Sequence, residues 1–239
     1  MSWSLKFAVV LGWVLLVAGC QSAPPPQGFE RSTRIEVRRV GIAPLGVPAE
    51  PQVLIKNPIG AGFGVLGNLI ESRRAAGARQ EMEAALAKVG YDYDEALTHS
   101  ISLAMHRAGF AVTVLPGPRP DKERGHFLSS YPSAPKVDAF LDVYAGFVGF
   151  QTPQSSEDYR PRLEIFARLI SAKDSRTLFQ ERIVYGSPGS ADEDTILVRA
   201  DDRFRFKNRA ALQANPATTA RALQGAIEAV AWELAKQFM

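Results

Sequence analysis

The sequence predicts an α+β domain with a mixed, largely antiparallel sheet and helices packed on it. Three stretches of alternating apolar residues follow one another within residues 137–186, and separate helical patterns precede and follow them. Hydrophobic residues make up 46% of the 239-residue chain, so one domain can bury a full core. We therefore expect a single domain over residues 34–239.

The first half of the domain alternates between strand and helix. Alternating apolar residues predict a strand in "RRVGIAPL" (38–45), and a helical stripe follows in "ARQEMEAALAKVG" (78–90). Asp94 is the predicted N-cap of the next helix, which ends at Gly109. A further strand is expected at "FAVTVL" (110–115).

The second half begins with the loop "PGPRPDKERG" (116–125), for which we expect mobility. Three strands are predicted after it, at 137–150, 162–172 and 177–186. Their alternation indicates a meander with one buried face, as antiparallel sheets commonly have.

The last predicted helix begins at Thr218 or Thr219 and buries one apolar stripe. The stripe consists of Leu223, Ile227, Val230, Leu234 and Phe238. Trp232 lies ~180° from that stripe, so it is either an anchor for a partner or a second buried contact. Upstream, "RFRFKNR" (203–209) predicts an edge strand with its aromatic residues inward and its cations outward.

Residues 1–19 have the features of a lipoprotein signal peptide. One cation, Lys6, precedes an apolar run from Phe7 to Ala18, which is shorter than the ~20 residues of a membrane-spanning helix. The tetrad Val17-Ala18-Gly19-Cys20 resembles a bacterial lipobox, which implies cleavage before Cys20 and acyl chains such as palmitate on its thiol. The alternative is an ordinary secretory signal with a chance cysteine. In the diderm lipoproteins that this tetrad resembles, a residue other than aspartate after the cysteine implies sorting to the outer membrane. Here that residue is Gln21.

Residues 20–33 form the predicted lipidated tether. Cys20 is the only cysteine of the chain, so it cannot close an internal disulfide. The stretch "QSAPPPQG" (21–28) is rich in proline, and we expect it to be extended and unable to join a core. Removal of Lys6 with the signal lowers the net charge from +3 to +2, a balance too weak to favour a nucleic-acid partner.

Gly62, Gly64 and Gly67 have the spacing G-x-G-x-x-G. In a dinucleotide site, a strand ends directly at the first glycine. Here Asn57-Pro58 favours a helix that begins before the glycines, so we predict no nucleotide at this segment. In that helix Gly60, Gly64 and Gly67 share one stripe, which indicates close packing against another element.

Three interpretations of the apolar glycine-rich segment, residues 57–77, stay open. The segment packs on a neighbouring subunit, it lies in the bilayer interface with Arg73, Arg74 and Arg79 at lipid phosphates, or it covers the domain's own core as a loop. As a helix, its apolar stretch would span only ~18 Å, less than the ~30 Å of a hydrocarbon core.

The spacing of the polar residues indicates no catalytic or metal site. His99 and His106 are seven residues apart on one side of a helix, or ~10 Å, which is too far for a shared metal and favours solvated positions. "YGSPGS" (185–190) departs from the pattern G-x-S-x-G. We therefore predict no metal, no cofactor and no enzymatic activity, and we keep a hydrolase using Glu95, His99 and Ser187 as the alternative.

The order of elements resembles that of a known family. The lipobox, "VRRVGIAPL", the paired helices ending in "GFAVTVL", "VDAFLDVYAGF" and "RLEIFARLISAKDSRTL" together carry the resemblance. They look like bacterial lipoproteins whose α/β domain is similar to that of the curli secretion-channel lipoprotein and the TolB amino-terminal region. The resemblance covers residues 38–239 and implies a non-enzymatic role in envelope assembly, secretion or cell-wall maintenance. The glycine-rich segment does not match a pore-forming hairpin.

We therefore expect an outer-membrane lipoprotein that is anchored by lipid on Cys20, faces the periplasm and acts through protein-protein contacts. The expected contact residues are Gly60, Gly64, Gly67 and Trp232. Envelope proteins are the expected partners, and homo-oligomerisation is left open. The alternatives are the envelope hydrolase and a peripheral membrane-remodelling protein that uses the glycine-rich segment.

Overall fold

The structure is a computed structural model, and it describes residues 25–30, 32–54, 64–134, 136–153, 158–187 and 192–239. For residues 64–75 it describes the backbone alone. Cys20 and Gly60, two of the predicted site residues, therefore lie outside the described residues. No helix in the described ranges is both long and apolar enough to cross a bilayer.

Within the described residues, seven strands form one sheet with the order β3-β1-β4-β5-β6-β7, and β2 pairs with β4 further along the edge that β1 occupies. The strands are β1 (Arg39–Ile42), β2 (Gln52–Leu54), β3 (Ala111–Val114), β4 (Ala139–Gln151), β5 (Arg160–Ser171), β6 (Thr177–Gly186) and β7 (Ile196–Arg199). β1 is parallel to both of its neighbours, β4 to β6 form an antiparallel meander, and β7 is parallel to β6. The predicted α+β class with a mixed sheet is confirmed.

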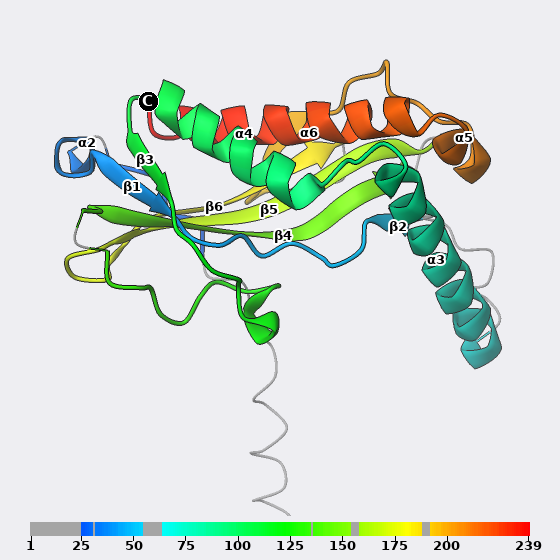
Figure 1. The fold of residues 1–239 in the computed structure, drawn as a ribbon, viewed down its shortest axis with the longest axis horizontal. Coiled ribbons are helices and arrows are strands. Elements are labelled where there is room, and N and C mark those ends of the chain that lie inside the picture. Colours follow the sequence, from blue (N-terminus) through cyan, green and yellow to red (C-terminus); the bar gives the residue numbers. More distant parts are fainter. Residues whose placement is uncertain (1–24, 31, 55–63, 135, 154–157, 188–191) are drawn as a thin grey trace, which may run out of the picture.

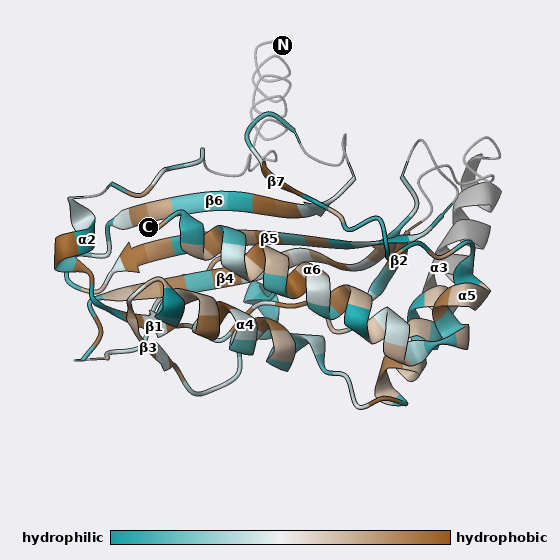
Figure 2. Cartoon of the chain, turned by 90° about the horizontal axis from the view of Figure 1, so that it is seen from above, coloured by the Kyte–Doolittle hydropathy of each residue, from teal (hydrophilic) through white to brown (hydrophobic). Residues whose placement is uncertain are grey.

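Two long helices, α4 (Tyr93–Arg107) and α6 (Pro216–Lys236), cover one face of the sheet (Figure 1). Figure 2 shows the same two helices from above, with α3 (Gly64–Ala87) and α5 (Arg209–Ala214) together at one end of the molecule and α2 (Thr33–Glu36) at the other. The opposite face carries the short 3-10 turn η2 (Asp121–Glu123) and the chain around it. We call the two sides the helix-covered face and the loop-covered face.

The main core lies between the sheet and the helix layer. The inward residues of β5 alternate with polar ones, as predicted, and the apolar stripes predicted for α4 and α6 are buried against them. These buried residues include Leu163, Ile165, Ala167, Leu169, Leu97, Ile101, Met105, Ile227, Val230 and Leu234. A second cluster at the α3 and α5 end joins Met82 and Leu86 to Phe150, Leu212 and Leu223.

The expected single buried face of the meander is wrong for β4. Phe140 and Asp142 face away from the main core, yet they are 5% and 0% exposed. Their burial shows that the segment between β3 and β4 covers this part of the loop-covered face.

Two predicted helix caps are also wrong. The N-cap of α4 is Asp92, whose side chain accepts hydrogen bonds from the backbone N–H groups of Asp94 and Glu95 at 2.8 and 3.1 Å. For α6 the cap is Asn215, followed by Pro216 at the first helical position. Thr219 instead donates its hydroxyl to a backbone carbonyl of the preceding helix.

The remaining differences concern short or interrupted elements. α3 runs without a break through Gly67 and Gly77, so residues 64–77 of the glycine-rich segment and most of the helix predicted at 78–90 form one element. Residues 203–209 are not an edge strand, since only Phe206 pairs there, in a single bridge with Tyr159. The elements β2, β7, α2 and α5, which are three to six residues long, were not predicted.

Candidate functional site

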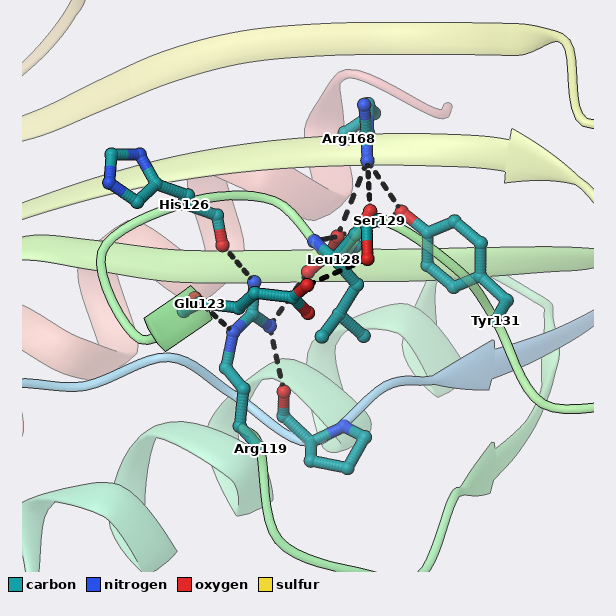
Figure 3. Close-up of polar contacts among 9 residues, drawn as sticks. Arg119, Glu123, His126, Leu128, Ser129, Tyr131 and Arg168 are labelled. Atoms are coloured by element: carbon teal, nitrogen blue, oxygen red, sulfur yellow. Dashed lines mark hydrogen bonds and ion pairs between the residues drawn. The ribbon is translucent and has the colours of Figure 1, made fainter. Parts of the chain in front are cut away.

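Arg119 and Asp142 form a buried ion pair on the loop-covered face (Figure 3). Nη1 of Arg119 lies 2.8 Å from Oδ1 of Asp142, and the two side chains are 2% and 0% exposed. Asp142 belongs to β4, whereas Arg119 belongs to the segment that connects β3 to β4. Desolvation of two charges costs several kcal/mol for each ion, so such a pair needs further hydrogen bonds to persist.

The guanidinium of Arg119 also bonds three backbone carbonyls. Nη1 donates to the carbonyl of Pro44 at 2.9 Å, Nε donates to that of Glu123 at 2.7 Å, and Nη2 donates to that of His126. One side chain therefore ties the chain after β1 to both sides of the turn that follows Arg119. The loop predicted to be mobile at 116–125 is anchored at this point, and the prediction of mobility is wrong for Arg119, which is 6% exposed.

The carboxylate of Asp142 is held from the other side by the same segment. Its Oδ2 accepts hydrogen bonds from the backbone N–H of Leu128 at 2.7 Å and from the hydroxyl of Tyr131 at 2.8 Å. Arg168 of β5 lies 3.6 Å from Oδ2 and donates to the Tyr131 oxygen at 2.8 Å. Burial, with the nearby charge of Asp142, raises the pKa of the Tyr131 phenol, so it stays protonated and donates.

We call Arg119, Tyr131, Asp142 and Arg168 the clasp, and residues 116–134 and 136–138 the clasped loop. Both carboxylate oxygens of Asp142 and all three guanidinium nitrogens of Arg119 are hydrogen-bonded within the protein. The chemistry of the pair is therefore structural: it fixes the clasped loop across the sheet. Gly46 shows how close this approach is, since a Cβ there would lie 2.2 Å from the carbonyl oxygen of Arg124.

Beside the clasp lies a hollow of about 410 Å³, which we call the aromatic hollow. Its floor is the stacked pair Tyr144 and Phe166, with ring centroids 4.6 Å apart, and Phe127 of the clasped loop stands edge-on to Tyr144 at 4.9 Å. Arg182 of β6 lies over Phe166 at 5.5 Å and makes an ion pair with Glu164 at 2.9 Å. The hollow thus offers apolar ring faces with a charged rim.

The N-terminal segment forms one wall of this hollow. Pro25 and Pro26 line it, and Gln27 then pairs with Gln180 of β6 through two backbone hydrogen bonds of 2.7 and 2.8 Å. Phe29 continues the contact by standing edge-on to Phe238 at 5.1 Å, among the residues packed against the main core. Gln27 thus pairs with the edge of the sheet through its backbone, while residues 25–28 are exposed and lie outside the core, as expected for this stretch. A single bridge has no periodicity that a sequence could display.

A second hollow, of about 550 Å³, lies where β1 and β3 end beside the N-terminal half of α4. Glu95 and His99 both line it, together with Asp94, whose pKa is raised by burial and by the neighbouring charge of Asp92. The carboxyl ends of parallel strands are a common place for ligands in α/β sheets. We call this the acidic hollow.

The structure brings Glu95 and His99 together but not Ser187. Ser187 follows the end of β6, and β4 and β5 separate that strand from β1 at the acidic hollow. His99 and His106 are exposed, as the sequence predicts. Among the described residues, no group of three or more histidine, cysteine or carboxylate side chains could hold a metal ion.

The predicted interaction residues lie in different parts of the molecule. Gly64 is the first residue of α3 and Gly67 lies in its first turn, at the end that extends away from the sheet (Figure 1). Trp232 lies on the outer side of α6 and is 44% exposed, so the interpretation of a second buried contact is wrong. In the 203–209 stretch, Phe206 is buried and Arg203 and Arg205 pair with neighbouring aspartates at the surface.

Neither a protein-family model nor a curated protein matches the chain, but solved structures do. A Xanthomonas campestris protein assigned to the family model DUF330 is 13% identical, with a TM-score of 0.44 over 88% of this chain and 87% of that one. The PelC dodecamer of Paraburkholderia phytofirmans is 8% identical, with a TM-score of 0.37 over 90% and 94%. The lipoprotein GNA1162 of Neisseria meningitidis is 11% identical, with a TM-score of 0.30 over 62% and 81%.

These similarities assign neither a family nor a function to the chain, because all three TM-scores are below 0.5. The neisserial protein is a lipoprotein, which is the class of protein that the sequence around Cys20 predicts for this chain. None of the three is the curli secretion lipoprotein or TolB, so that finer resemblance stays a prediction.

Proposed function

We propose that the chain is an outer-membrane lipoprotein whose domain faces the periplasm and acts without catalysis, as an accessory in envelope assembly, secretion or cell-wall maintenance. Support comes from the tetrad Val17-Ala18-Gly19-Cys20 at the end of a short apolar run, and from Gln21 after it. Each buried methylene of a lipid chain contributes ~0.8 kcal/mol to membrane binding, and more than one chain is needed for stable anchoring.

The observation that carries the proposal is the short distance along the chain between Cys20 and the first residue that pairs with the sheet. Gln27 is hydrogen-bonded to β6, and it lies seven positions after Cys20. Even a fully extended chain spans at most ~25 Å over seven residues. Lipid on Cys20 would thus keep the domain at the membrane surface, where tethering raises the local concentration of partners and weak contacts suffice.

The outer side of α6 is the contact surface that we propose for a partner. Trp232 is 44% exposed there, and Arg221 and Lys236 are exposed on the same helix. Tryptophan and arginine are the residue types that dominate binding energy at protein interfaces. The partner is an envelope protein or a second copy of the chain.

Metabolic labelling with palmitate tests the anchor. The mature chain should carry the label and fractionate with membranes, and Cys20→Ser should lose both while it folds normally. A photoreactive residue at the exposed position 221, on the same side of α6 as Trp232, should then capture a partner in cells, whereas one at the exposed position 103 of α4 should not. An unlabelled wild-type chain, or a mature terminus elsewhere than at position 20, would contradict the proposal.

The acidic hollow keeps an envelope enzyme as a second candidate, because Glu95 and His99 share it. The two side chains are exposed and have no structural role in the core, so alanine at either position should preserve folding. Loss of the cellular phenotype in Glu95→Ala and His99→Ala, with Trp232→Ala unaffected, would favour the enzyme. The opposite pattern would favour the interaction protein.

A further inference from the structure

The N-terminal segment reaches the domain from the loop-covered face. Pro25 and Pro26 line the aromatic hollow on that face beside Tyr144 and Phe166. The side chain of Gln180 on β6 donates to the carbonyl of Pro25 at 3.4 Å. Read toward the N-terminus, the chain therefore leaves the edge of β6 over the loop-covered face, on the side opposite α4 and α6.

From Gln27 onward the segment is fixed to the domain at several points. The backbone of Gln27 pairs with that of Gln180, and its side chain donates to the carbonyl of Thr177 at 3.0 Å. Phe29 then packs edge-on against Phe238. Arg34 donates to the carbonyl of Ala108 at the end of α4, and its guanidinium lies 3.9 Å from the ring centroid of Phe110.

These contacts run from the edge of β6 across the end of the sheet to the C-terminal ends of α6 and α4. Gln27 is fixed at the edge of β6, while Phe29 and Arg34 contact the ends of α6 and α4 on the helix-covered face. We call residues 25–30 and 32–34 the docked segment. Because Gln27, Phe29 and Arg34 are all held, the fold sets the point at which the chain leaves the domain, at Pro25 on the loop-covered face.

The reach of the remaining chain then decides which face can lie near an anchored Cys20. Only five positions separate Cys20 from Pro25, a span of at most ~18 Å. Pro25 lies on the loop-covered face, whereas α6 lies on the other side of the sheet, so this short stretch brings the loop-covered face closer to an anchored Cys20 than the outer side of α6.

The course of α3 agrees with this orientation. In Figure 1 the helix begins at Gly64 on the side of the sheet where the clasped loop lies, and it rises from there to join the second core cluster. Its first turn and the exit of the N-terminal segment are thus on the same side of the sheet.

We propose that the docked segment orients the domain so that its loop-covered face lies against the lipid headgroups, while the outer side of α6 faces the periplasm. This inference rests on the proposed lipid anchor at Cys20. It assigns a bilayer-facing surface, made of the clasped loop and the rim of the aromatic hollow, to a domain whose sequence shows no membrane-binding pattern there.

Fluorescence quenching on vesicles tests the orientation. Cys20 is the only cysteine and would be acylated, so Lys122→Cys on η2 and Glu228→Cys on α6 each give one labelling site on the mature, lipidated protein. Both side chains are exposed, and the two positions lie on opposite faces. With a nitroxide on the headgroups of the vesicle lipids, the probe at position 122 should lose most of its emission and the probe at 228 should lose little.

Two variants of the docked segment separate docking from anchoring. Gln27→Pro, combined with Phe29→Ser, removes the backbone N–H that bonds Gln180 and the contact with Phe238, so the two probes should become equally quenched. Gln27→Ala keeps the backbone pair and should keep most of the difference. Circular dichroism checks that each variant is folded.

The outcomes distinguish this inference from the proposed function. If the wild-type chain does not float with the vesicles or carries no palmitate, the lipid anchor itself is wrong. If it floats and carries palmitate but both probes are quenched equally, or the probe at 228 more strongly, the anchor stands and the orientation is overturned.

Discussion

On the helix-covered face of the sheet, Ile165 and Leu169 of β5 lie in one apolar cluster with Ile227 of α6. On the loop-covered face, Asp142 of β4 and Arg119 hold a loop in place with charges that are as deeply buried as those apolar side chains. The first face is stabilised by removal of apolar surface from water, which depends little on direction. The second depends on a few directional bonds, so it fails all at once when one partner is lost.

Removal of the Asp142 carboxylate is expected to have the largest effect. Asp142→Ala leaves the buried guanidinium of Arg119 without its counter-charge and frees the Leu128 N–H, so the free energy of unfolding should fall by about 3–5 kcal/mol. Urea denaturation followed by circular dichroism measures it. Glu193→Ala, at an exposed carboxylate, is the control and should leave the midpoint unchanged.

A double variant sharpens the interpretation. Replacement of both charges by apolar residues, in Arg119→Met with Asp142→Leu, removes the unpaired ion and should be less destabilising than Asp142→Ala alone. If the double variant is the worse of the two, the clasp stabilises the protein through its geometry and not only by avoiding an unpaired charge. A loss below about 1 kcal/mol for Asp142→Ala would mean that water replaces the clasp.

On the helix-covered face, Ile165→Ala is expected to lower the free energy of unfolding by about 2–4 kcal/mol. Ile165 is fully buried between β4, β6 and the helix layer, so the truncation leaves a cavity. Ile165→Val removes one methylene and should cost about 1 kcal/mol. A small loss of unfolding free energy in Ile165→Val and a larger one in Ile165→Ala would support the contrast with the loop-covered face, where one substitution at Asp142 removes the whole ion pair. Equal losses in the two Ile165 variants would refute it.

The same contrast explains how much of the fold could be predicted. The inward residues of β5 and the stripes of α4 and α6 repeat with the period of their element, so local sequence specifies them. The cap of α4 was misplaced by two positions because Asp92 and Asp94 are equally good cap residues in sequence. The cap of α6 was misplaced by three or four positions, although asparagine ranks above threonine as a cap and Pro216 after Asn215 is a sequence signal for a helix start.

The loop-covered face could not be predicted for a different reason. Arg119, Asp142 and Arg168 come from three segments of the chain, and each residue type is normally exposed. Their charged groups can be buried only because the fold brings them together as ion pairs. Pro120 and Gly125 likewise indicate a loop but say nothing about what holds it. The docking of Gln27 gave no signal either, because its two backbone hydrogen bonds with Gln180 and its side-chain hydrogen bond to the carbonyl of Thr177 leave no periodic pattern in the sequence.

A substitution at Asp138 is expected to have a smaller effect on stability than one at Asp142. Asp138 also forms an ion pair with an arginine, just before β4, but it is partly exposed. It accepts hydrogen bonds from the Arg39 guanidinium and from the backbone N–H groups of Arg38 and Arg39, and these lower the pKa of its carboxyl. Arg39 is 53% exposed, which screens the pair, so Asp138→Asn should cost only about 1 kcal/mol at neutral pH.

The pH dependence of that loss follows from the direction of the shift. A carboxyl with a lowered pKa in the folded state contributes stability above the unfolded-state pKa of about 3.9, and the contribution disappears as the pH falls through the lower folded-state pKa. Wild type and Asp138→Asn should therefore differ at pH 7 and converge in urea denaturation as the pH falls from about 3.9 through the lower folded-state pKa. A constant difference across this range would show that the carboxylate charge has no part in it.

The smallest expected effect on stability is that of a substitution at Trp232. The experiment decides whether α6 binds a partner as well as packing against the core. One side of α6 fills the core, whereas Trp232 on the other side is 44% exposed and contributes little to folding. Trp232→Ala should change the free energy of unfolding by less than about 0.5 kcal/mol, yet it should abolish partner capture in cells. Leu103→Ala, at an equally exposed residue of α4, is the matched control and should preserve capture. A destabilisation above about 1 kcal/mol would instead make Trp232 a packing residue, and the contact surface would have to be sought elsewhere.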